Sequence, residues 1–390
     1  MKIAYITTYD LIDSSKWLKY NQGNYGSSRY IFNSLKSQNI NIECIDNLQK
    51  KYAAISRLKW EFYRQVFQQD YYSWAESLIC RNYSQQVKDK LAKINPDIIV
   101  SPEGFTPIAY LDSPQPLVLW IDTVIASLVD YYPYLSNLCY ETKNNIYSLE
   151  KRGLQQCQTI IFTSDWAAQE AIKIYHLPKE KIKVIPRGAN FEIYPGRSIN
   201  DINTIIKSRD RTKIKLTYVG IDWQRKGGNL TLEIAEELHH SGLDIEMRII
   251  GDLPKNLHKL PGFVNPIGYI NKSTPEGKKY YYHLLADSHF LILPTQADIT
   301  PNVLIEANAF GVPCISTCVG GIPTIIKNNL NGKLFNIDDV ATNYCDYITH
   351  ILQDYSNYEE LAINSFYEYQ NHLNWRVAAN TAKQIFTDLM

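Results

Sequence analysis

Short apolar runs rich in β-branched residues recur along the chain, with helix-like stretches between them. The first series is KIAYIT (2–7), NIECI (41–45), DIIVS (97–101), LVLWI (117–121), TIIFT (159–163) and KVIP (183–186). The second series is IKLTYVG (214–220), IEMRIIG (245–251), HFLILP (289–294) and PCISTC (313–318). Strands that alternate with helices are typical of parallel α/β sheets. The pattern therefore predicts an α/β protein with two Rossmann-like domains.

A polar stretch, residues 191–213, separates the two series and shows no sustained period. Such a stretch is typical of a connection between domains. We expect a first domain over residues 1–192 and a second over residues 193–373. In the last segment, 374–390, apolar residues recur at spacings of three and four, which predicts a helix. We expect this helix to need an apolar surface on which to pack.

Residues 52–92 are helical in pattern and crowded with aromatic side chains. Two interpretations fit this segment. The first is a helical insertion that covers its own domain through aromatic packing. The second is a surface that faces an acceptor or a lipid, and it is suggested by Arg57, Lys59 and Arg64, which lie among the aromatics. Acidic residues are interspersed with the basic ones, which favours the first interpretation.

Composition narrows the classes of protein. The chain has 390 residues, 45% of them apolar, and 40 basic residues balance 40 acidic ones. This excludes a small disulfide scaffold and a disordered chain, and it gives no global field for binding nucleic acid. The first residues predict a strand rather than a signal peptide, and no apolar run reaches the roughly 18 residues of a membrane span. We expect a cytoplasmic protein, with any membrane contact peripheral, at the inner face and through residues 52–92.

The segment PTQADITPNVLIEANAFGVP (294–313) carries the most chemical information. It begins at the carboxyl end of a predicted strand, where open α/β sheets bind ligands. Thr300 followed by Pro301 predicts an N-cap and a first helical residue, and Gly311 and Pro313 predict the helix end. The expected helix therefore covers residues 301–310.

The first amides of that helix, at Asn302, Val303 and Leu304, predict an anion site such as a phosphate site. Glu306 lies on the same helical face and Asp298 lies in the loop before the helix. Carboxylates accept hydrogen bonds from vicinal diols, and a sugar nucleotide has diols on both sides of its diphosphate. The alternative is a pair of surface carboxylates that cap neighbouring loops.

A second anion-binding element is VGIDWQRKGGNL (219–230), a strand, a glycine turn and the start of a helix. Lys226 is the basic residue that precedes the helix, and Arg225 lies beside it. The alternative is that both are solvated residues of a surface turn.

The spacing from Asp298 to Glu306 resembles the E-x7-E motif of retaining glycosyltransferases of family 4, which have the GT-B fold. Asp in place of the first Glu departs from that motif. The segments VIPRGAN (184–190), TSDWA (163–167) and NGKLF (331–335) are similar to the family's domain-end motif, preceding strand and helix, and late turn. The resemblance extends over most of the chain.

This resemblance implies a GT-B fold, with two domains facing a cleft and a C-terminal helix, 374–390, that crosses back to the first domain. It implies that Glu306 binds the nucleotide ribose and Asp298 contacts the donor sugar. It also implies that Lys226 neutralises the diphosphate together with an Arg. Ile221 stands at the usual place of that Arg, so we expect Arg225 to substitute for it.

Weaker resemblances concern three other places. Gly23 and Gly26 are similar to a glycine-rich loop under the donor phosphates, although glycines are also common in turns. Tyr269 and Ile270, in GYI (268–270), fall at the family's base-binding loop, and hydrophobic packing explains them equally well. Asp122 falls where many members place an interdomain histidine near the sugar and the acceptor, and helix capping is its alternative role.

We therefore expect a retaining, metal-independent transfer of a hexose from a nucleoside-diphosphate sugar, with UDP or GDP left open, to a hydroxyl of a glycan, a lipid-linked or a small-molecule acceptor. The expected catalytic residues are Asp298, Asp122, Lys226 and Arg225. No cofactor is expected, and no Asp-x-Asp stands where it would bind a metal for the donor. The alternatives are a nucleotide-sugar epimerase, a sugar phosphorylase, or a non-catalytic protein that binds sugar nucleotides or glycans.

Overall fold

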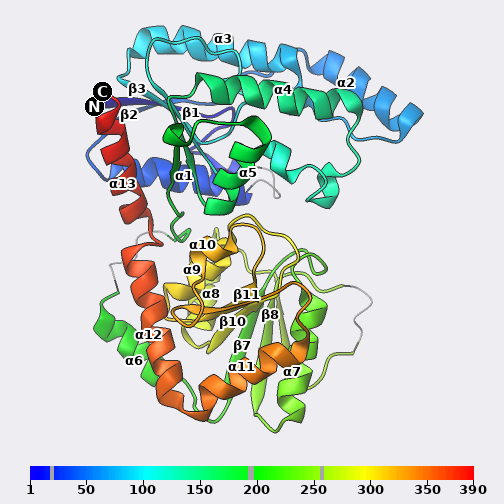
Figure 1. Cartoon of the computed structure of the whole chain (residues 1–390), viewed down its shortest axis with the longest axis vertical. Coiled ribbons are helices and arrows are strands. Elements are labelled where there is room, and N and C mark those ends of the chain that lie inside the picture. The colour runs from blue at the N-terminus through cyan, green and yellow to red at the C-terminus, as the bar shows by residue number, and fades with distance from the viewer. Residues whose placement is uncertain (18–21, 192–196, 255–258) are drawn as a thin grey trace. The chain divides into compact units, whose positions relative to one another are not determined.

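The computed structural model describes residues 1–17, 22–191, 197–254 and 259–390. They form two compact units, Met1–Pro186 with Trp375–Met390, and Arg187–Asn374 (Figure 1). The predicted boundary, between residues 192 and 193, lies outside the described residues.

The first unit is an α/β unit around one parallel sheet. Its strands are β1 (Lys2–Ile6), β2 (Asn41–Ile45), β3 (Ile98–Ser101), β4 (Leu117–Ile121), β5 (Thr159–Phe162) and β6 (Ile182–Val184). Its α-helices are α1 (Gln22–Lys36), α2 (Ala53–Phe62), α3 (Ser77–Ile94), α4 (Tyr140–Gln156), α5 (Asp165–Tyr175) and α13 (Trp375–Asp388). Short helical turns are η1 (Ser14–Lys16), η3 (Tyr63–Phe67), η4 (Ser73–Ala75), η5 (Ile125–Leu128), η6 (Pro133–Leu135) and η7 (Lys179–Lys181), of which η3 is a π-helix and the others are 3-10 helices.

The described strands of this unit pair in the order β2-β1-β3-β4-β5-β6, and all the pairs are parallel. Every residue of β3, β4 and β5 is buried. Such strands need cover on both faces, which explains why their sequences are continuous apolar runs without alternation.

The second unit repeats this architecture. Its strands are β7 (Ile214–Val219), β8 (Ile245–Ile250), β9 (Val264–Gly268), β10 (Phe290–Leu293), β11 (Cys314–Thr317) and β12 (Gly332–Phe335). Its helices are α6 (Ile199–Lys207), α7 (Gly228–His240), α8 (Pro275–Ala286), α9 (Asn302–Asn308), α10 (Ile322–Ile325), α11 (Ala341–Gln353) and α12 (Tyr355–Asn371). The described strands follow the order β12-β11-β10-β7-β8-β9, which is the doubly wound Rossmann order.

The two edge strands of this second sheet, β9 and β12, are absent from the predicted series. The segment of β9 contains Pro266 and ends at Gly268, and β12 lies where a late turn was expected. An edge strand tolerates proline because one side of its backbone makes no ladder hydrogen bonds. The composition of these two segments was therefore a weak indication that they are strands.

Residues 52–92 divide into two parts with different surroundings. Helix α3 packs on the first unit through buried Ile79, Cys80, Tyr83, Val87 and Leu91, as the packing interpretation requires. In α2 the only buried residue is Ser56. None of the described helices is both long and apolar enough to cross a bilayer.

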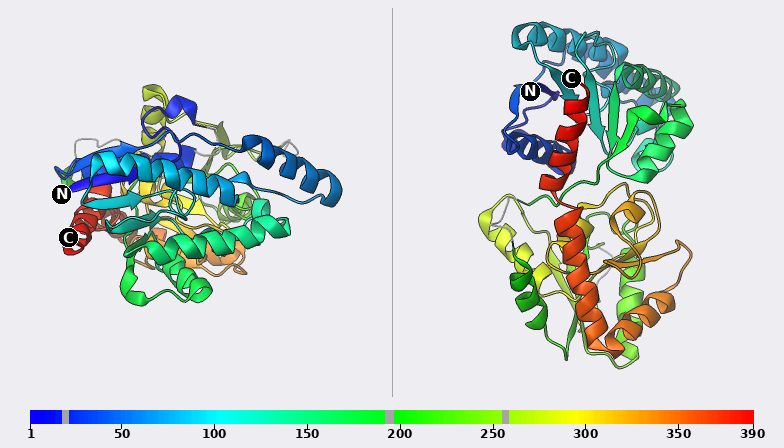
Figure 2. Two further views of the ribbon diagram at one scale, coloured as in Figure 1. Left: turned by 90° about the horizontal axis from the view of Figure 1, so that it is seen from above. Right: turned by 60° about the vertical axis from the view of Figure 1, so that its left-hand side comes forward.

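The last helix, α13, belongs to the first unit, as the crossing-helix prediction requires. Trp375, Ala378, Ala382 and Phe386 are buried in the same apolar cluster as Tyr5 and other strand residues. Tyr30 of α1 stacks on Trp375, with ring centroids 6.3 Å apart. The right-hand view of Figure 2 shows α13, in red, lying along this unit.

The anchoring of α13 predicts a stability effect. Phe386→Ala removes a fully buried ring, so we expect the free energy of unfolding of the first unit to fall by about 3–5 kcal/mol. Chemical denaturation measures this change. The control is Thr381→Ala, on the exposed side of the same helix, which should change stability by less than about 0.5 kcal/mol. Equal stability of the two variants would contradict the packing of α13 on this unit.

Candidate functional site

The second sheet reverses its strand order between β7 and β10. From this point the chain runs outward to β8 and β9 on one side and to β11 and β12 on the other. In doubly wound sheets, ligands bind outside the carboxyl ends of the strands at such a switch point. The loops that follow β7 and β10 hold Arg225, Lys226 and Asp298. Strand order therefore brings together residues about 72 positions apart in sequence.

Hydrogen bonds and a close backbone contact fix these two loops against each other. The carbonyl oxygen of Arg225 accepts hydrogen bonds from the Gln296 amide, at 2.7 Å, and from Thr295 Oγ1, at 2.9 Å. Gly227 has φ of +74°, and a Cβ on it would lie 1.9 Å from the carbonyl oxygen of Pro294. Only glycine fits a left-handed backbone this close to a neighbouring chain.

Asp298 lies beside both cations that were predicted to bind the diphosphate, Lys226 and Arg225. Its carboxylate accepts a hydrogen bond from Lys226 Nζ, and Arg225 Nη1 lies 3.7 Å from its Oδ1 atom. Arg225 also donates to the Ala297 carbonyl at 2.7 Å and to Asp222 Oδ2 at 2.9 Å. Asp298 is buried, so these charges interact through little water. The side chain of Ile221, at the family's usual Arg position, is exposed.

The helix after this loop is shorter than predicted. Helix α9 spans Asn302–Asn308, and Pro301 is its N-cap with an extended ψ of 114° and no side-chain cap bond. The prediction of Thr300 as N-cap and of a helix over residues 301–310 is therefore wrong. The helix starts one residue later because the backbone of Pro301 is still extended. Of the three amides predicted for an anion, that of Leu304 already donates to the Pro301 carbonyl at 3.2 Å.

Glu306 is fully buried on α9 and has its own cation and donor. Lys272 Nζ lies 3.1 Å from both carboxylate oxygens, and the Tyr281 hydroxyl donates to Oε2 at 2.7 Å. Burial and the neighbouring Glu306 carboxylate hold the pKa of Tyr281 well above its usual value, so its hydroxyl stays protonated. The surface-carboxylate alternative does not fit Glu306.

Lys272 and Tyr281 were missed by the sequence analysis. Lys272 follows the predicted base-binding residues Tyr269 and Ile270, which lie in the loop after β9, with the Tyr269 side chain half exposed. Tyr281 is the middle tyrosine of YYY (280–282), and nothing in that run distinguishes it from its neighbours. In the second unit the predicted cations Lys226 and Arg225 therefore gather at Asp298, whereas Glu306 is held by two residues that were not predicted.

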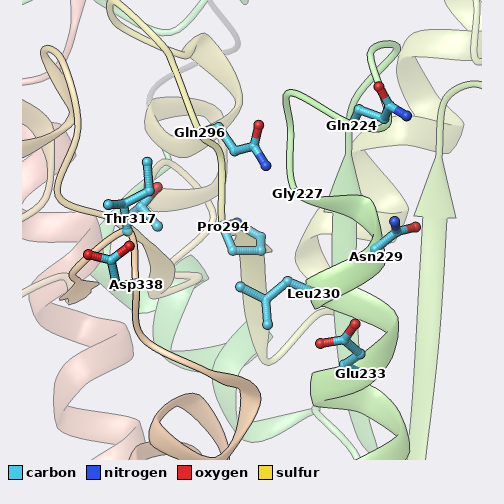
Figure 3. A pocket seen from close by; sticks show the side chains of 10 residues that line it. Gln224, Gly227, Asn229, Leu230, Glu233, Pro294, Gln296, Thr317 and Asp338 are labelled. Carbon is cyan, nitrogen blue, oxygen red and sulfur yellow. The ribbon is translucent and has the colours of Figure 1, made fainter.

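A cavity of about 650 Å³ opens beside the Asp298 loop at the start of α7 (Figure 3). Its lining includes Gln224, Gly227, Gln296, Thr317 and Asp338. None of the predicted donor-binding residues is among the described residues that line it. Within the described ranges, no group of three or more His, Cys, Asp or Glu side chains is arranged to hold a metal ion.

In the first unit, the prediction for Gly23 and Gly26 is wrong in its local structure. Both glycines lie within α1 rather than in a loop, and a Cβ on either would have no neighbour within 4 Å. Neither glycine is therefore required by a close backbone approach, and both continue the helical segment Gln22–Lys36.

Asp122 follows β4 in a loop that a buried carboxylate holds in place. Thr163 Oγ1 donates to the Asp122 carbonyl at 3.3 Å. Glu150 accepts hydrogen bonds from the amides of Ile125, at 2.7 Å, and Ala126, at 3.0 Å, and its burial raises its pKa to about 7. The next helical turn, η5, begins after Val124, so Asp122 is not its N-cap.

Glu103 is a further buried carboxyl group that the sequence pattern did not indicate. It follows β3, which neighbours β1 where the first sheet reverses its order. Its carboxylate accepts hydrogen bonds from the backbone amide and the hydroxyl of Thr8 in the loop after β1. Burial raises the pKa of Glu103 to about 7.

The contact between Gly227 and Pro294 generates a prediction. Gly227→Ala would force an L residue into a left-handed backbone, which costs roughly 1–2 kcal/mol, and would press its Cβ against the Pro294 carbonyl. We expect the melting temperature of the second unit to fall. Gly262→Ala is the control, because a Cβ there has no neighbour within 4 Å. A Gly227→Ala protein that melts like Gly262→Ala would show that the two loops separate without cost.

Comparisons with known proteins cover both units. Residues 213–354 match the family model described as glycosyl transferases group 1, and residues 58–193 match the model described as glycosyltransferase family 4. An Escherichia coli relative, UDP-Gal:alpha-D-GlcNAc-diphosphoundecaprenol alpha-1,3-galactosyltransferase, is 25% identical over 181 residues, which are 43% of this chain and 45% of the relative. The chain spans about half the length of such curated relatives.

Solved structures share the whole fold. Sucrose-phosphate synthase from Thermosynechococcus elongatus superimposes with a TM-score of 0.69 at 15% identity, covering 100% of this chain and 98% of the other. The UDP-glucose complex of HepE from Anabaena gives a TM-score of 0.61 at 14% identity and covers 100% of both chains. These likenesses show the GT-B fold. Together with the two family matches, they support the conclusion that this chain is a glycosyltransferase of the family 4 type.

Proposed function

We propose that this protein transfers a hexose from a nucleoside-diphosphate sugar to an acceptor hydroxyl, with retention at the anomeric carbon and without a metal ion. The observation that carries the proposal is the convergence of Lys226 and Arg225 on Asp298 at the switch point of the second sheet. Two cations beside a sugar-binding carboxylate suit a diphosphate that is joined to a sugar.

In this proposal the diphosphate lies against Lys226 and Arg225. Its negative charge would compete with Asp298 for the ammonium of Lys226, and the Asp298 carboxylate would then be released toward hydroxyls of the donor sugar. In the structure these charges are balanced, because each cation has a carboxylate partner. Ligand binding would therefore give Lys226 the diphosphate as its ionic partner, and Asp298 would gain hydrogen bonds from sugar hydroxyls in place of the ammonium.

Glu306 is proposed to accept hydrogen bonds from the nucleotide ribose. Lys272 is half exposed and can turn toward solvent or toward a phosphate, which would free carboxylate lone pairs for the diol. Tyr281 would keep its hydrogen bond to Oε2 and hold the carboxylate in place. Tyr269 and Ile270, in the loop beside Lys272, are proposed to contact the base.

The proposed chemical step takes place on one face of the sugar. The bond between the anomeric carbon and the diphosphate oxygen breaks, and a bond from that carbon to the acceptor oxygen forms on the same face. The acceptor proton passes to an oxygen of the leaving diphosphate. Lys226 and Arg225 stabilise the charge that collects on this diphosphate. A role of Asp122 near the acceptor stays a prediction.

The comparisons suggest where to look for substrates. The Escherichia coli relative is named for UDP-galactose and a diphosphoundecaprenol-linked acceptor, and HepE is a neighbour with UDP-glucose bound. We propose UDP-hexoses as the first donors to test and glycan or lipid-linked alcohols as the first acceptors. The cytoplasmic location stays a prediction.

Product analysis tests this proposal against its alternatives. The protein is incubated with nucleoside-diphosphate hexoses and a panel of acceptors, and the anomeric configuration of each product is read by NMR. Glycosylated acceptor with the donor's configuration is expected, and EDTA should leave the rate unchanged. A changed donor sugar without acceptor would indicate an epimerase, a sugar 1-phosphate formed with inorganic phosphate would indicate a phosphorylase, and donor binding without any product would indicate a binding protein.

The Glu306 assignment predicts a loss of donor affinity. Glu306→Gln removes charge-assisted hydrogen bonds worth about 1.5–3 kcal/mol, so calorimetry should show binding weakened by about tenfold to a hundredfold. Glu276→Gln, an exposed carboxylate change on α8, is the matched control. Unchanged affinity in a folded Glu306→Gln protein would remove Glu306 from the ribose site.

The Asp298 assignment predicts a difference between two ligands. Asp298→Ala should weaken binding of the intact nucleotide sugar more than binding of the bare nucleoside diphosphate, because only the former brings a hexose to this side chain. Asp338→Ala, in the neighbouring cavity, is the control for loss of a nearby carboxylate. A parallel change in both dissociation constants would mean that Asp298 only orders Lys226 and Arg225.

A further inference from the structure

Helix α2 and the π-turn η3 present a row of apolar side chains to solvent. Ile55, Leu58, Phe62 and Val66 are 42%, 67%, 52% and 60% exposed. Their spacings of three, four and four place them on one side of a continuous helical segment. An apolar stripe normally faces the core of a soluble protein, so the outward orientation of this stripe needs a reason.

The side of α2 that attaches to the first unit is polar. Lys59 forms ion pairs with Glu76, at 2.8 Å, and with Glu141. Tyr63 donates to Glu141 Oε2 at 3.1 Å and stacks on Tyr71 with ring centroids 5.9 Å apart. These contacts fix the rotation of the helix about its axis, and they keep the apolar row pointing away from the core.

The segment projects from its own unit. In Figure 1 and in the left-hand view of Figure 2, α2 lies at an extremity of the first unit, beyond the end of the sheet. The aromatic residues Tyr52, Trp60 and Phe67 are also half exposed there. The apolar surface is therefore a protruding ridge.

Positive charge surrounds this ridge. Residues 50–67 contain five basic residues and one acidic residue, although the whole chain has a net charge of zero. One of the five, Lys59, is neutralised by Glu76 and Glu141, so four basic residues remain beside the ridge. The acidic residue, Glu61, is paired with Arg57 at 3.1 Å, and the guanidinium of Arg64 lies 4.8 Å from the ring centroid of Trp60. Lys50 and Lys51 precede the helix. Apolar and aromatic side chains flanked by basic ones are the pattern of helices that lie in the interface of an anionic membrane.

We propose that residues 50–67 form a membrane-binding surface, in which the apolar row enters the headgroup region of a bilayer and the basic residues contact anionic lipid headgroups. The charge distribution favours lipid over a second copy of this chain, because a symmetric contact through the ridge would place the same basic residues opposite one another. This proposal uses no donor-site residue and is independent of the proposed transfer reaction.

Co-sedimentation with vesicles tests the proposal. One set of vesicles is pure phosphatidylcholine, and the other is an equimolar mixture of phosphatidylcholine and phosphatidylglycerol. We expect the full chain to partition onto the anionic vesicles and much less onto the neutral ones. The double variant Leu58→Glu with Phe62→Glu should bind the anionic vesicles at least about tenfold more weakly, because it loses two apolar side chains that would be buried in the bilayer.

Charge variants separate the two contributions. Lys51→Gln with Arg64→Gln should weaken binding to the anionic vesicles by about fivefold per residue and leave binding to neutral vesicles unchanged. Val340→Glu is the matched control for the glutamate variant of the ridge, because it places a glutamate at an exposed apolar position of the second unit, where Val340 is 61% exposed. It should bind as the unchanged protein does. Circular dichroism checks that each variant is folded. We expect all of them to fold, because the substituted side chains lie outside the core.

Two results would overturn the proposal. Either the unchanged protein fails to sediment with anionic vesicles, or the Leu58→Glu, Phe62→Glu variant sediments as well as the unchanged protein. If vesicle binding is absent and sedimentation velocity shows a dimer that this variant disperses, the ridge binds a second copy of the chain. The experiment contains neither donor nor acceptor, so its outcome and that of the transfer assay are independent.

Discussion

The contact between the loops after β7 and β10 is the constraint on which the candidate site depends. Gly227 permits a backbone approach that no other residue allows, and the carbonyl of Arg225 is bonded from the opposite loop. Because both loops start from adjacent strands deep in the second sheet, their positions follow from the sheet itself. The side chains of Lys226 and Asp298 then meet without any long or flexible connection between them.

Charge neutralisation is the second feature that shapes both units. Each buried carboxylate has a specific set of donors, but the nature of the donors differs. Glu306 has an ammonium and a hydroxyl, and Asp298 has an ammonium and a guanidinium nearby. Glu150 has only neutral donors, two amides and a hydroxyl, and burial therefore raises its pKa. Asp298 and Glu306, which have cationic partners, lie in the candidate site of the second unit, whereas Glu150 holds a loop in the first.

The first unit uses aromatic residues in two opposite ways. On α13 and α3, apolar and aromatic side chains complete the cover of the sheet. On α2, ion pairs of Lys59 hold the helix while the apolar row faces outward. The exposed row is not required for the core, because the sheet is already covered by other helices. This outward row is the surface that we propose to contact a membrane.

Local sequence patterns determined the strands and most of the site segments. Ten strands appear as short runs rich in β-branched residues, and the central ones, such as β3, β4 and β5, are continuously apolar because they are buried on both faces. The short-range signals around Lys226, Asp298 and Glu306 also depend only on adjacent residues, so the candidate donor segments were visible in the chain. The resemblance to family 4 glycosyltransferases added roles to these residues.

Other features were decided only by tertiary structure. Sheet order determined that Lys226 meets Asp298, and that Lys272 and Tyr281 surround Glu306, because these partners are far apart in sequence. The extended backbone of Pro301 shortened α9, and Gly23 and Gly26 lie in a helix rather than in a loop. The aromatic pattern of residues 52–92 did not indicate which side of α2 faces solvent, because helical periodicity gives a stripe but not its orientation. That orientation follows from Glu76 and Glu141, whose positions are fixed by the packing of α3 and α4.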